Sequence, residues 1–342
     1  MSALPATSRE WHLVARPQGE PKPEDFALRT AAVRAPGEGH VLVRNLYFSV
    51  DPYMRGRMGP TPGYAYFPPY DLNEVLGGHA VGEVVTANAP GIEAGDHVLH
   101  FGGWREYADV AAADVTKVGA VDGVPLTAYL SVLGMTGLSA YAGLFEVASF
   151  KEGDVVFVSG AAGAVGSQAG QLARINGAAR VIGSAGTDEK VEALKERFGF
   201  DDAFNYRTAP VAEQLAKAAP EGIDVYFDTV GGDHLEAAIA SLNEHGRVAM
   251  CGAIAQYNDI EPPPGPRNLA QAIGKRLSLR GMLVTDFEAL QPRFIEEVSA
   301  WVRSGELDWR ETIVEGIENG TGAFLGLFRG DNTGKMIVRL SH

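Results

Sequence analysis

The residues best suited to binding chemistry are three glycines spaced three apart in Ser-Gly-Ala-Ala-Gly-Ala-Val-Gly, at positions 159–166. An apolar, β-branched block at 154–158 precedes them and predicts a buried strand, and apolar residues at helical spacing follow as far as Ile175. Strand, glycine turn and helix is the order found in dinucleotide-binding turns. Gly163 would let the main chain approach a pyrophosphate, and Gly166 would let the helix lie close to the strand. The free N–H groups at the helix start would face the anion.

The glycine pattern matches the dinucleotide fingerprint only in part. Ala161 replaces the first glycine of G-x-G-x-x-G, and Gly160 lies one residue early. The same segment is therefore also compatible with a tight strand-to-helix turn in another kind of α/β protein.

The residues after the second expected strand indicate which dinucleotide would bind. NAD-binding folds carry a carboxylate there, about twenty residues after the glycines, but positions 184–187 are Ser-Ala-Gly-Thr. Thr187 is a candidate N-cap, and Lys190, one turn on, could neutralise a 2′-phosphate. This favours NADP(H). Two alternatives stay open: the lysine only faces solvent, or Asp188 and Glu189 repel the phosphate.

Composition excludes several classes of partner. The 342 residues are 46% hydrophobic and include 42 glycines, which fits a loop-rich globular protein of about two domains. The net charge of −14 repels polyanions, so neither nucleic acid nor an anionic membrane surface is expected as a partner. The one cysteine, Cys251, excludes an intrachain disulfide and a thiolate metal cluster. With no apolar leader core and no apolar run of about 18 residues, we expect a cytoplasmic protein.

Two kinds of secondary-structure pattern follow each other along the chain. From residue 11 to about 118, short alternating runs are cut by Pro and Gly, which predicts an all-β unit. From about 127, strand and helix patterns alternate, which predicts an α/β fold with a parallel sheet covered on both faces. Strands are expected there at 155–158, 180–183, 203–205, 225–228 and 247–250, and helices include 138–147 and 292–304. Strand patterns return at 312–314 and 336–340 and are expected to rejoin the first unit.

Seven short segments of the chain, taken together in their order, form a recognisable set of motifs. They are Val-Asp-Pro-Tyr-Met-Arg-Gly-Arg at 50–57, Gly-Met-Thr-Gly-Leu-Ser-Ala-Tyr at 134–141, Ala-Ala-Gly-Ala-Val-Gly at 161–166, Ala-Phe-Asn-Tyr at 203–206, Tyr-Phe-Asp-Thr-Val-Gly-Gly at 226–232, Cys-Gly-Ala-Ile at 251–254 and Gly-Asp-Asn-Thr-Gly-Lys at 330–335. In this order the sequence resembles the zinc-independent medium-chain dehydrogenase/reductase superfamily, specifically its prostaglandin reductase and alkenal double-bond reductase branch. The resemblance covers essentially the whole chain.

The resemblance implies a domain organisation. It implies a discontinuous GroES-like β-barrel domain, residues 1–126 and 306–342, and a doubly wound Rossmann NADP-binding domain, residues 127–305. The active site would lie in the cleft between them, and a homodimer is expected.

The resemblance also implies a set of cofactor contacts. Gly163, Ala164, Val165 and Gly166 would wrap the pyrophosphate, and Lys190 with Tyr206 would hold the 2′-phosphate. The other expected cofactor-binding residues are Met135, Thr136, Gly186, Thr229, Cys251, Gly252, Ile254, Tyr257, Met282, Leu283, Val284 and Asn332. Two residues depart from the branch, which commonly has Asn where Thr229 stands and Pro where Thr136 stands.

The sequence gives little support for a catalytic metal. Gly78-His79-Ala80 echoes the Gly-His-Glu of zinc-dependent relatives, but the glutamate is missing and no cysteine lies near in sequence. One histidine does not make a zinc site, so we expect His79 to be a core or cleft residue. The substrate must then be activated by hydrogen bonding.

Hydride transfer from NADPH to the β-carbon of an α,β-unsaturated carbonyl fits that limit, because a few donors can stabilise a delocalised enolate. A tyrosine hydroxyl is a neutral donor at pH 7, and its ring packs on apolar substrates. By family position, Tyr257 is the first candidate as enolate stabiliser or proton donor, and Tyr53 the second as substrate wall. Tyr64 and Tyr66 would cover the mouth of the site. For each tyrosine, simple packing is the alternative.

Two arginines near Tyr53 have two possible roles. Arg55 and Arg57 would attract a carboxylated substrate or pin loops.

The best-supported activity is an NADPH-dependent alkenal or enone double-bond reductase. A quinone reductase and a non-catalytic NADPH-binding sensor are the rivals.

Overall fold

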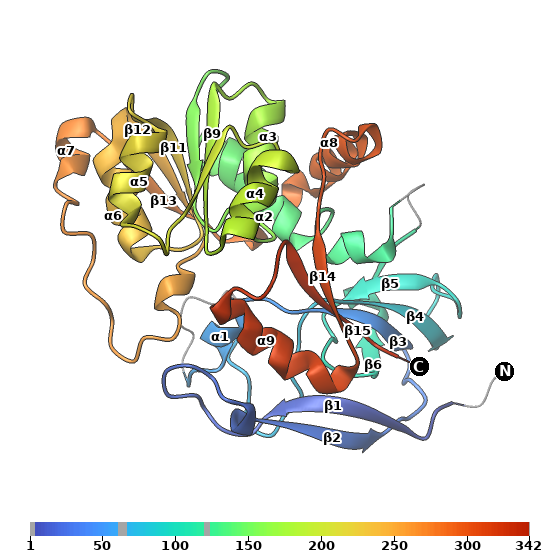
Figure 1. Ribbon diagram of the computed structural model, residues 1–342. Helices are drawn as coiled ribbons and strands as arrows, with labels where there is room; N and C mark the ends of the chain where they lie inside the picture. Colours follow the sequence, from blue (N-terminus) through green and yellow to red (C-terminus); the bar gives the residue numbers. More distant parts are fainter. Residues whose placement is uncertain (1–3, 61–66, 120–123, 342) are drawn as a thin grey trace. The chain divides into compact units, whose positions relative to one another are not determined.

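The computed structural model describes residues 4–60, 67–119 and 124–341, and it divides into two compact units. One consists of Met1–Leu130 with Glu311–His342, and the other is Ser131–Arg310. Figure 1 shows the elements of both. Within the described ranges, no helix is both long enough and apolar enough to cross a membrane.

The second unit is built on a six-stranded parallel sheet. In spatial order its strands are β10 (Asp202–Asn205), β9 (Arg180–Ala185), β8 (Val155–Val158), β11 (Ile223–Asp228), β12 (Leu242–Met250) and β13 (Ser278–Gly281). The chain runs outward from β8 to β10 and then returns to β11 on the other side of β8. This reversal between β8 and β11 is the switch point at which doubly wound sheets bind ligands.

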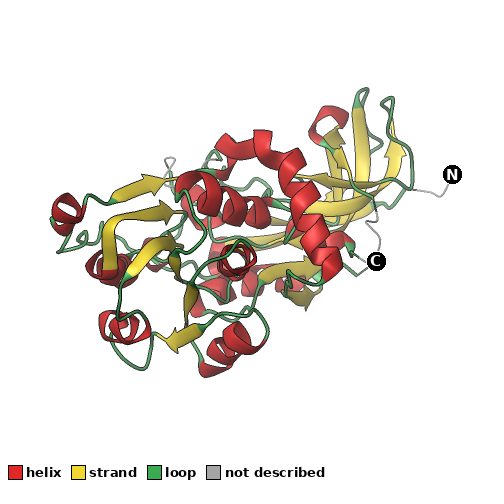
Figure 2. Ribbon diagram, turned by 90° about the horizontal axis from the view of Figure 1, so that it is seen from above, coloured by secondary structure: helices red, strands yellow, loops and turns green. Residues whose placement is uncertain are grey.

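Helices lie on both sides of this sheet (Figure 2). They are α2 (Met135–Ala142), α3 (Gly166–Ile175), α4 (Asp188–Glu196), α5 (Val211–Ala218), α6 (Gly232–Ser241), α7 (Gln271–Lys275) and α8 (Gln291–Ser304). The central strands are apolar on both faces because helices cover both. On the face beneath α5 and α6, Phe157 stacks on Tyr226, with ring centroids 5.1 Å apart, and on Phe204. The predicted α/β class with a doubly wound parallel sheet is confirmed.

The first unit is rich in antiparallel strands. Its main sheet contains β14 (Glu311–Glu315), β15 (Lys335–Arg339), β3 (His40–Ser49), β4 (Ala80–Ala87), β5 (His97–His100) and β7 (Thr116–Lys117) in that order, with β6 (Tyr107–Ala111) also paired to β3. The hairpin β1 (Thr7–Leu13) and β2 (Phe26–Ala32), and the helices α1 (Met54–Arg57) and α9 (Gly320–Arg329), complete it. Ile337 of β15 pairs with Ser49 of β3, so the C-terminal strand does rejoin the N-terminal sheet.

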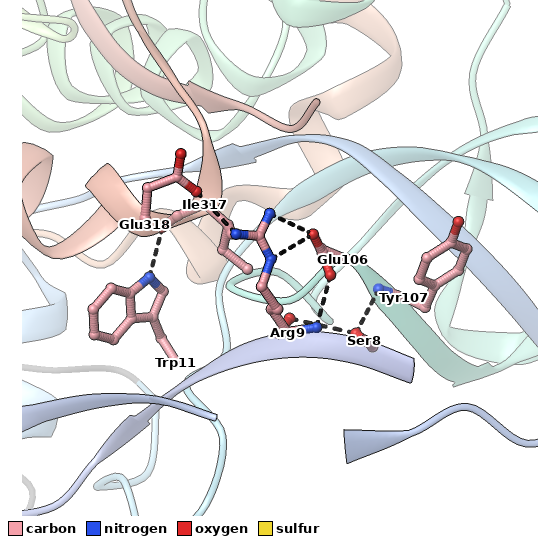
Figure 3. Close-up of polar contacts among 7 residues, drawn as sticks. All are labelled: Ser8, Arg9, Trp11, Glu106, Tyr107, Ile317 and Glu318. Atoms are coloured by element: carbon pink, nitrogen blue, oxygen red, sulfur yellow. Dashed lines mark hydrogen bonds and ion pairs between the residues drawn. The ribbon is translucent and has the colours of Figure 1, made fainter. Parts of the chain in front are cut away.

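A polar network attaches β1 to the C-terminal segment of this unit (Figure 3). The Arg9 guanidinium donates from Nε and Nη2 to Glu106 Oε1, at 2.9 and 2.8 Å, and from Nη1 to Glu318, at 3.1 Å. The indole of Trp11 donates to the carbonyl oxygen of Ile317 at 2.7 Å. These bonds explain how segments about 300 residues apart in sequence form one unit.

Candidate active site

The glycine turn lies between β8 and α3, at the switch point of the sheet. Gly160 has a φ of +56°, which glycine adopts without strain. A Cβ on Gly166 would lie 2.6 Å from the carbonyl oxygen of Gly160, so only glycine lets α3 begin this close to the strand. Ala161 is fully buried, and Gly183 of β9 leaves the space that its methyl group needs. The partial match to the fingerprint is thus explained: Gly160 makes the turn one residue early.

A buried carboxylate organises the facing end of β11. Asp228 is 1% exposed, and its Oδ1 accepts from the Tyr226 hydroxyl at 2.7 Å, from Ser159 Oγ at 3.2 Å and from two following main-chain N–H groups. Burial raises the pKa of Asp228. Thr229 Oγ1 donates to the Ser159 carbonyl at 2.8 Å, which ties the end of β11 to the glycine turn. This network was not predicted from the sequence, where an Asp ending an apolar strand before Gly-Gly was the signal for it.

The segment expected to bind the 2′-phosphate begins where β9 ends. Thr187 caps α4 by accepting from the Lys190 N–H at 3.3 Å, so the N-cap prediction is confirmed. A Cβ on Gly186 would lie 2.9 Å from the Tyr206 hydroxyl oxygen and 3.5 Å from Cζ of Arg207. The structure therefore brings Gly186 and Tyr206 together. It adds Arg207, a cation that was not predicted as a site residue although it directly follows Tyr206. The Asp188 carboxylate accepts a hydrogen bond from the Asn205 side-chain amide, at 2.8 Å.

The segment after β12 places Tyr257 at the same edge of the sheet. The Ala253 N–H donates to the Tyr257 hydroxyl oxygen at 3.3 Å, and a Cβ on Gly252 would lie 3.3 Å from that oxygen. The Ile254 N–H donates to the Thr229 carbonyl at 3.2 Å. Thr229, Gly252, Ile254 and Tyr257, predicted from far-apart segments, are therefore neighbours.

Cys251, the one cysteine of the sequence, lies at this edge of the sheet. Its main-chain N–H donates to the Asp228 carbonyl at 2.9 Å. Burial, together with the negative charge of Asp228, raises the pKa of Cys251 to about 12. A raised pKa favours the protonated thiol at neutral pH.

The remaining predicted residues of this unit lie beyond β12. Met282, Leu283 and Val284 follow β13, and the Met282 N–H donates to the Met250 carbonyl at 3.2 Å. Met135 and Thr136 begin α2, which packs against the segment Val284–Leu290. The Thr136 hydroxyl donates to the Ser131 carbonyl at 2.9 Å, so it stabilises its own turn.

Other predicted residues belong to the first unit. Tyr53 immediately precedes α1, and its ring centroid lies 5.4 Å from that of Phe67. Asn332 lies before β15 and donates to the Gly334 carbonyl at 2.7 Å. Tyr64 and Tyr66 lie outside the described residues. Contact of Tyr53 and Asn332 with the cofactor residues stays a prediction.

The side chains of Arg57, His79 and His100 make contacts with other residues of this unit. The Arg57 guanidinium lies 3.9 Å from the Tyr70 ring centroid and donates to the carbonyls of Pro68 and Gly77, so it pins loops. The His79 ring meets Phe101 edge to face at 5.0 Å, and burial lowers its pKa. Both ring nitrogens of His100 are hydrogen-bonded, to Asn45 Oδ1 and to the Gly102 N–H.

A parallel sheet with a glycine turn at its switch point, facing strand ends that carry a phenol, defines a Rossmann-type dinucleotide-binding protein. Two family models match the chain: "N-terminal domain of oxidoreductase" at residues 9–118 and "Zinc-binding dehydrogenase" at residues 164–301.

Several known proteins are similar over nearly the full length. An NADPH-dependent curcumin reductase of Escherichia coli is 40% identical, with 98% of this chain and 97% of that protein covered. An NADP(+)-dependent 2-alkenal reductase of Nicotiana tabacum is 40% identical, with 94% of each covered. The crystal structure of CurA from Vibrio vulnificus in complex with NADPH is 38% identical, with a TM-score of 0.92 over 98% of this chain and 99% of that one. The chain belongs to the medium-chain dehydrogenase/reductase superfamily, in its prostaglandin reductase and alkenal double-bond reductase branch, as the sequence motifs predicted.

One family model is described as zinc-binding, which raises the question whether side chains of this protein could hold zinc. Catalytic zinc takes three protein ligands from His, Cys, Asp or Glu. Across 4–60, 67–119 and 124–341, no group of three such side chains is placed to hold a metal ion. His79 packs on Phe101 instead, and Cys251 belongs to the other unit. The described residues do not fit a zinc centre.

Proposed function

We propose that the protein is an NADPH-dependent reductase of carbon–carbon double bonds conjugated to the carbonyl of aldehydes or ketones, and that it acts without zinc. The observation that carries the proposal is the position of the Tyr257 hydroxyl. It is held by the Ala253 N–H beside Gly252, at the edge of the sheet that carries the glycine turn. Two similar proteins are named as an NADPH-dependent curcumin reductase and an NADP(+)-dependent 2-alkenal reductase, and these names support the proposal.

The glycine turn and the following helix suit the cofactor's pyrophosphate. Gly163 and Gly166 leave the main chain bare, and the start of α3 presents N–H groups to an anion. Lys190, Tyr206 and Arg207 supply two positive charges and a hydroxyl for a 2′-phosphate. This set favours NADP(H) over NAD(H).

NADPH bound here would supply a hydride to the β-carbon of the substrate and leave as NADP+, and the charge that develops would be an enolate; a proton from solvent at the α-carbon would complete the saturated product. Tyr257 is then the donor to the enolate oxygen. The bond that it accepts from Ala253 orients its hydroxyl, and an oriented neutral donor stabilises developing charge without reorganisation. Tyr53 serves as the apolar wall for the substrate.

Incubation of the protein with NADPH and a panel of 2-alkenals, 2-alkenones and quinones tests the proposal. We expect saturated aldehydes and ketones as products. Tyr257→Phe should lower kcat about a hundredfold, as loss of one oxyanion donor does. Tyr129→Phe is the matched control, because the Tyr129 hydroxyl donates to the Gly119 carbonyl at the surface.

Two outcomes of this panel contradict the proposal. Hydroquinones as the sole products would favour a quinone reductase. Tight NADPH binding without any oxidation of NADPH would favour a non-catalytic sensor.

We also propose a cytoplasmic homodimer. The edge strand β13 supports the dimer, since it ends the sheet and its outer side pairs with no other strand of the described chain. Exposed apolar side chains, Ile273 and Leu283, lie in the segments before and after it. Light scattering should give twice the mass of one chain.

A further inference from the structure

An ion pair is buried in the first unit. Lys335, the first residue of β15, and Asp51 are each 2% exposed, and Lys335 Nζ lies 3.1 Å from Asp51 Oδ1. The same Nζ donates to the Val50 carbonyl at 2.7 Å and to the Met336 carbonyl at 2.9 Å. An ammonium group has three protons, so this one is fully hydrogen-bonded.

The pair holds a corner of the main chain. Asp51 Oδ2 accepts from the Ser49 hydroxyl, and the Asp51 carbonyl accepts from the Met54 N–H, at 3.2 Å, where α1 begins. The Val50 N–H donates to the Met336 carbonyl at 3.2 Å. The corner from β3 into α1 is therefore tied to the strand that carries Lys335.

The ion pair contributes more to fixing the conformation of the main chain than to the stability of the fold. Burial lowers the pKa of Lys335, and the Asp51 carboxylate acts against that shift. Because desolvation opposes the attraction, a buried pair is weak evidence for stability, but it does restrict the chain to an arrangement that satisfies every donor.

Tyr53 stands two residues after Asp51, and its carbonyl accepts from the Gly56 N–H at 3.0 Å inside α1. We propose that Lys335 is a positioning residue: by binding the Val50 carbonyl and the Asp51 carboxylate, it fixes the corner that sets Tyr53 for substrate contact. The inference rests on the proposed function in one respect, the role of Tyr53 as substrate wall.

Lys335→Met tests the proposal by steady-state kinetics. The KM for the alkenal should rise about tenfold with kcat changed less than about threefold, since a displaced binding group loses orientation. The KM for NADPH should change much less, because the residues expected to bind its phosphates belong to the other unit and Asn332 is the one expected cofactor residue in this unit. A merely structural role would instead lower kcat through loss of active molecules and leave both KM values as they are.

The chain offers a matched control. Lys117→Met also breaks a Lys–Asp pair in the first unit, with Asp96 at 2.7 Å, but that lysine side chain is 53% exposed. It should leave both KM values unchanged. Combined with Tyr53→Ala, Lys335→Met should have little further effect on kcat/KM, because both changes remove one interaction. Additive effects would overturn the proposal.

Lys335→Met leaves a buried carboxylate without its cation and is at risk of misfolding. The double variant Asp51→Asn/Lys335→Met removes both charges and should fold, with the same raised KM. Hydrogen exchange at residues 50–57 should be faster in it than in the parent protein, a readout that needs no turnover. If the parent protein proves inactive, the proposed function fails while the exchange result still decides the positioning role. Unchanged exchange, or failure of both variants to fold, would overturn that role.

Discussion

At the scale of single residues, we expect cofactor choice to depend on a few charges around Gly186. Lys190 lies in the first turn of α4, and Arg207 lies close to Gly186 and Tyr206. A 2′-phosphate at this point would meet both cations. The absence of a carboxylate from the tip of β9 removes the usual partner of an unphosphorylated ribose.

Lys190→Ala should weaken NADPH binding on the order of tenfold and leave NADH binding nearly unchanged, because only NADPH carries the 2′-phosphate. Fluorescence titration with each cofactor measures this. Lys195→Ala, in the last turn of the same helix, is the control and should affect neither cofactor. An equal loss for NADPH and NADH would show that Lys190 only faces solvent.

At the scale of elements, the junction of β8 and α3 depends on a glycine that has no room for a side chain. Gly166→Ala places a methyl group 2.6 Å from a main-chain oxygen, so the helix start must move. We expect unfolding to become easier by about 1–3 kcal/mol, as overpacking costs, and NADPH binding to weaken as well.

Gly322→Ala is the matched control for that change. Gly322 lies within α9, and a Cβ there meets no atom within 4 Å. This substitution should be neutral or stabilise by about 0.5–1 kcal/mol, because alanine favours a helix. Urea unfolding of both variants measures the difference, and equal effects would contradict the close packing of α3.

At the scale of the whole molecule, we expect three histidines with lowered pKa values to make the fold sensitive to acid. Burial lowers the pKa of His100 to about 3 and that of His234 to about 4, and it also lowers the pKa of His79, from an ordinary value of 6.5. Below that value the unfolded chain binds more protons than the native one. The stability from these groups is complete above pH 6.5 and is lost as the pH falls toward 4, by up to about 1.4 kcal/mol per pH unit for each histidine.

Urea unfolding at steps from pH 7.5 to pH 5 measures this slope. His100→Gln should reduce it, because one depressed group is removed. A slope independent of His100 would contradict the account.

Much of the fold was predictable because its signals are local. The apolar block at 155–158, the N-cap Thr187 and the strand ending at Asp228 depend on neighbours in sequence, and each was found at its predicted place. β13 was missed because Ser-Leu-Arg-Gly has no strand pattern of its own and becomes a strand by pairing with β12. The helix expected at 138–147 begins at Met135 instead, and Gly143–Val147 continues it as a π-helix.

The amino-acid sequence by itself determined the alternation of strands and helices, the glycine turn and the family, because periodicity, caps and bare backbone act over a few residues. Only the tertiary structure decided which distant groups meet: Arg207 beside Gly186, the Ile254 N–H on the Thr229 carbonyl, and Lys335 on Asp51, 284 positions away. Such contacts follow from how strands order and pack in a sheet, and no local pattern carries that information.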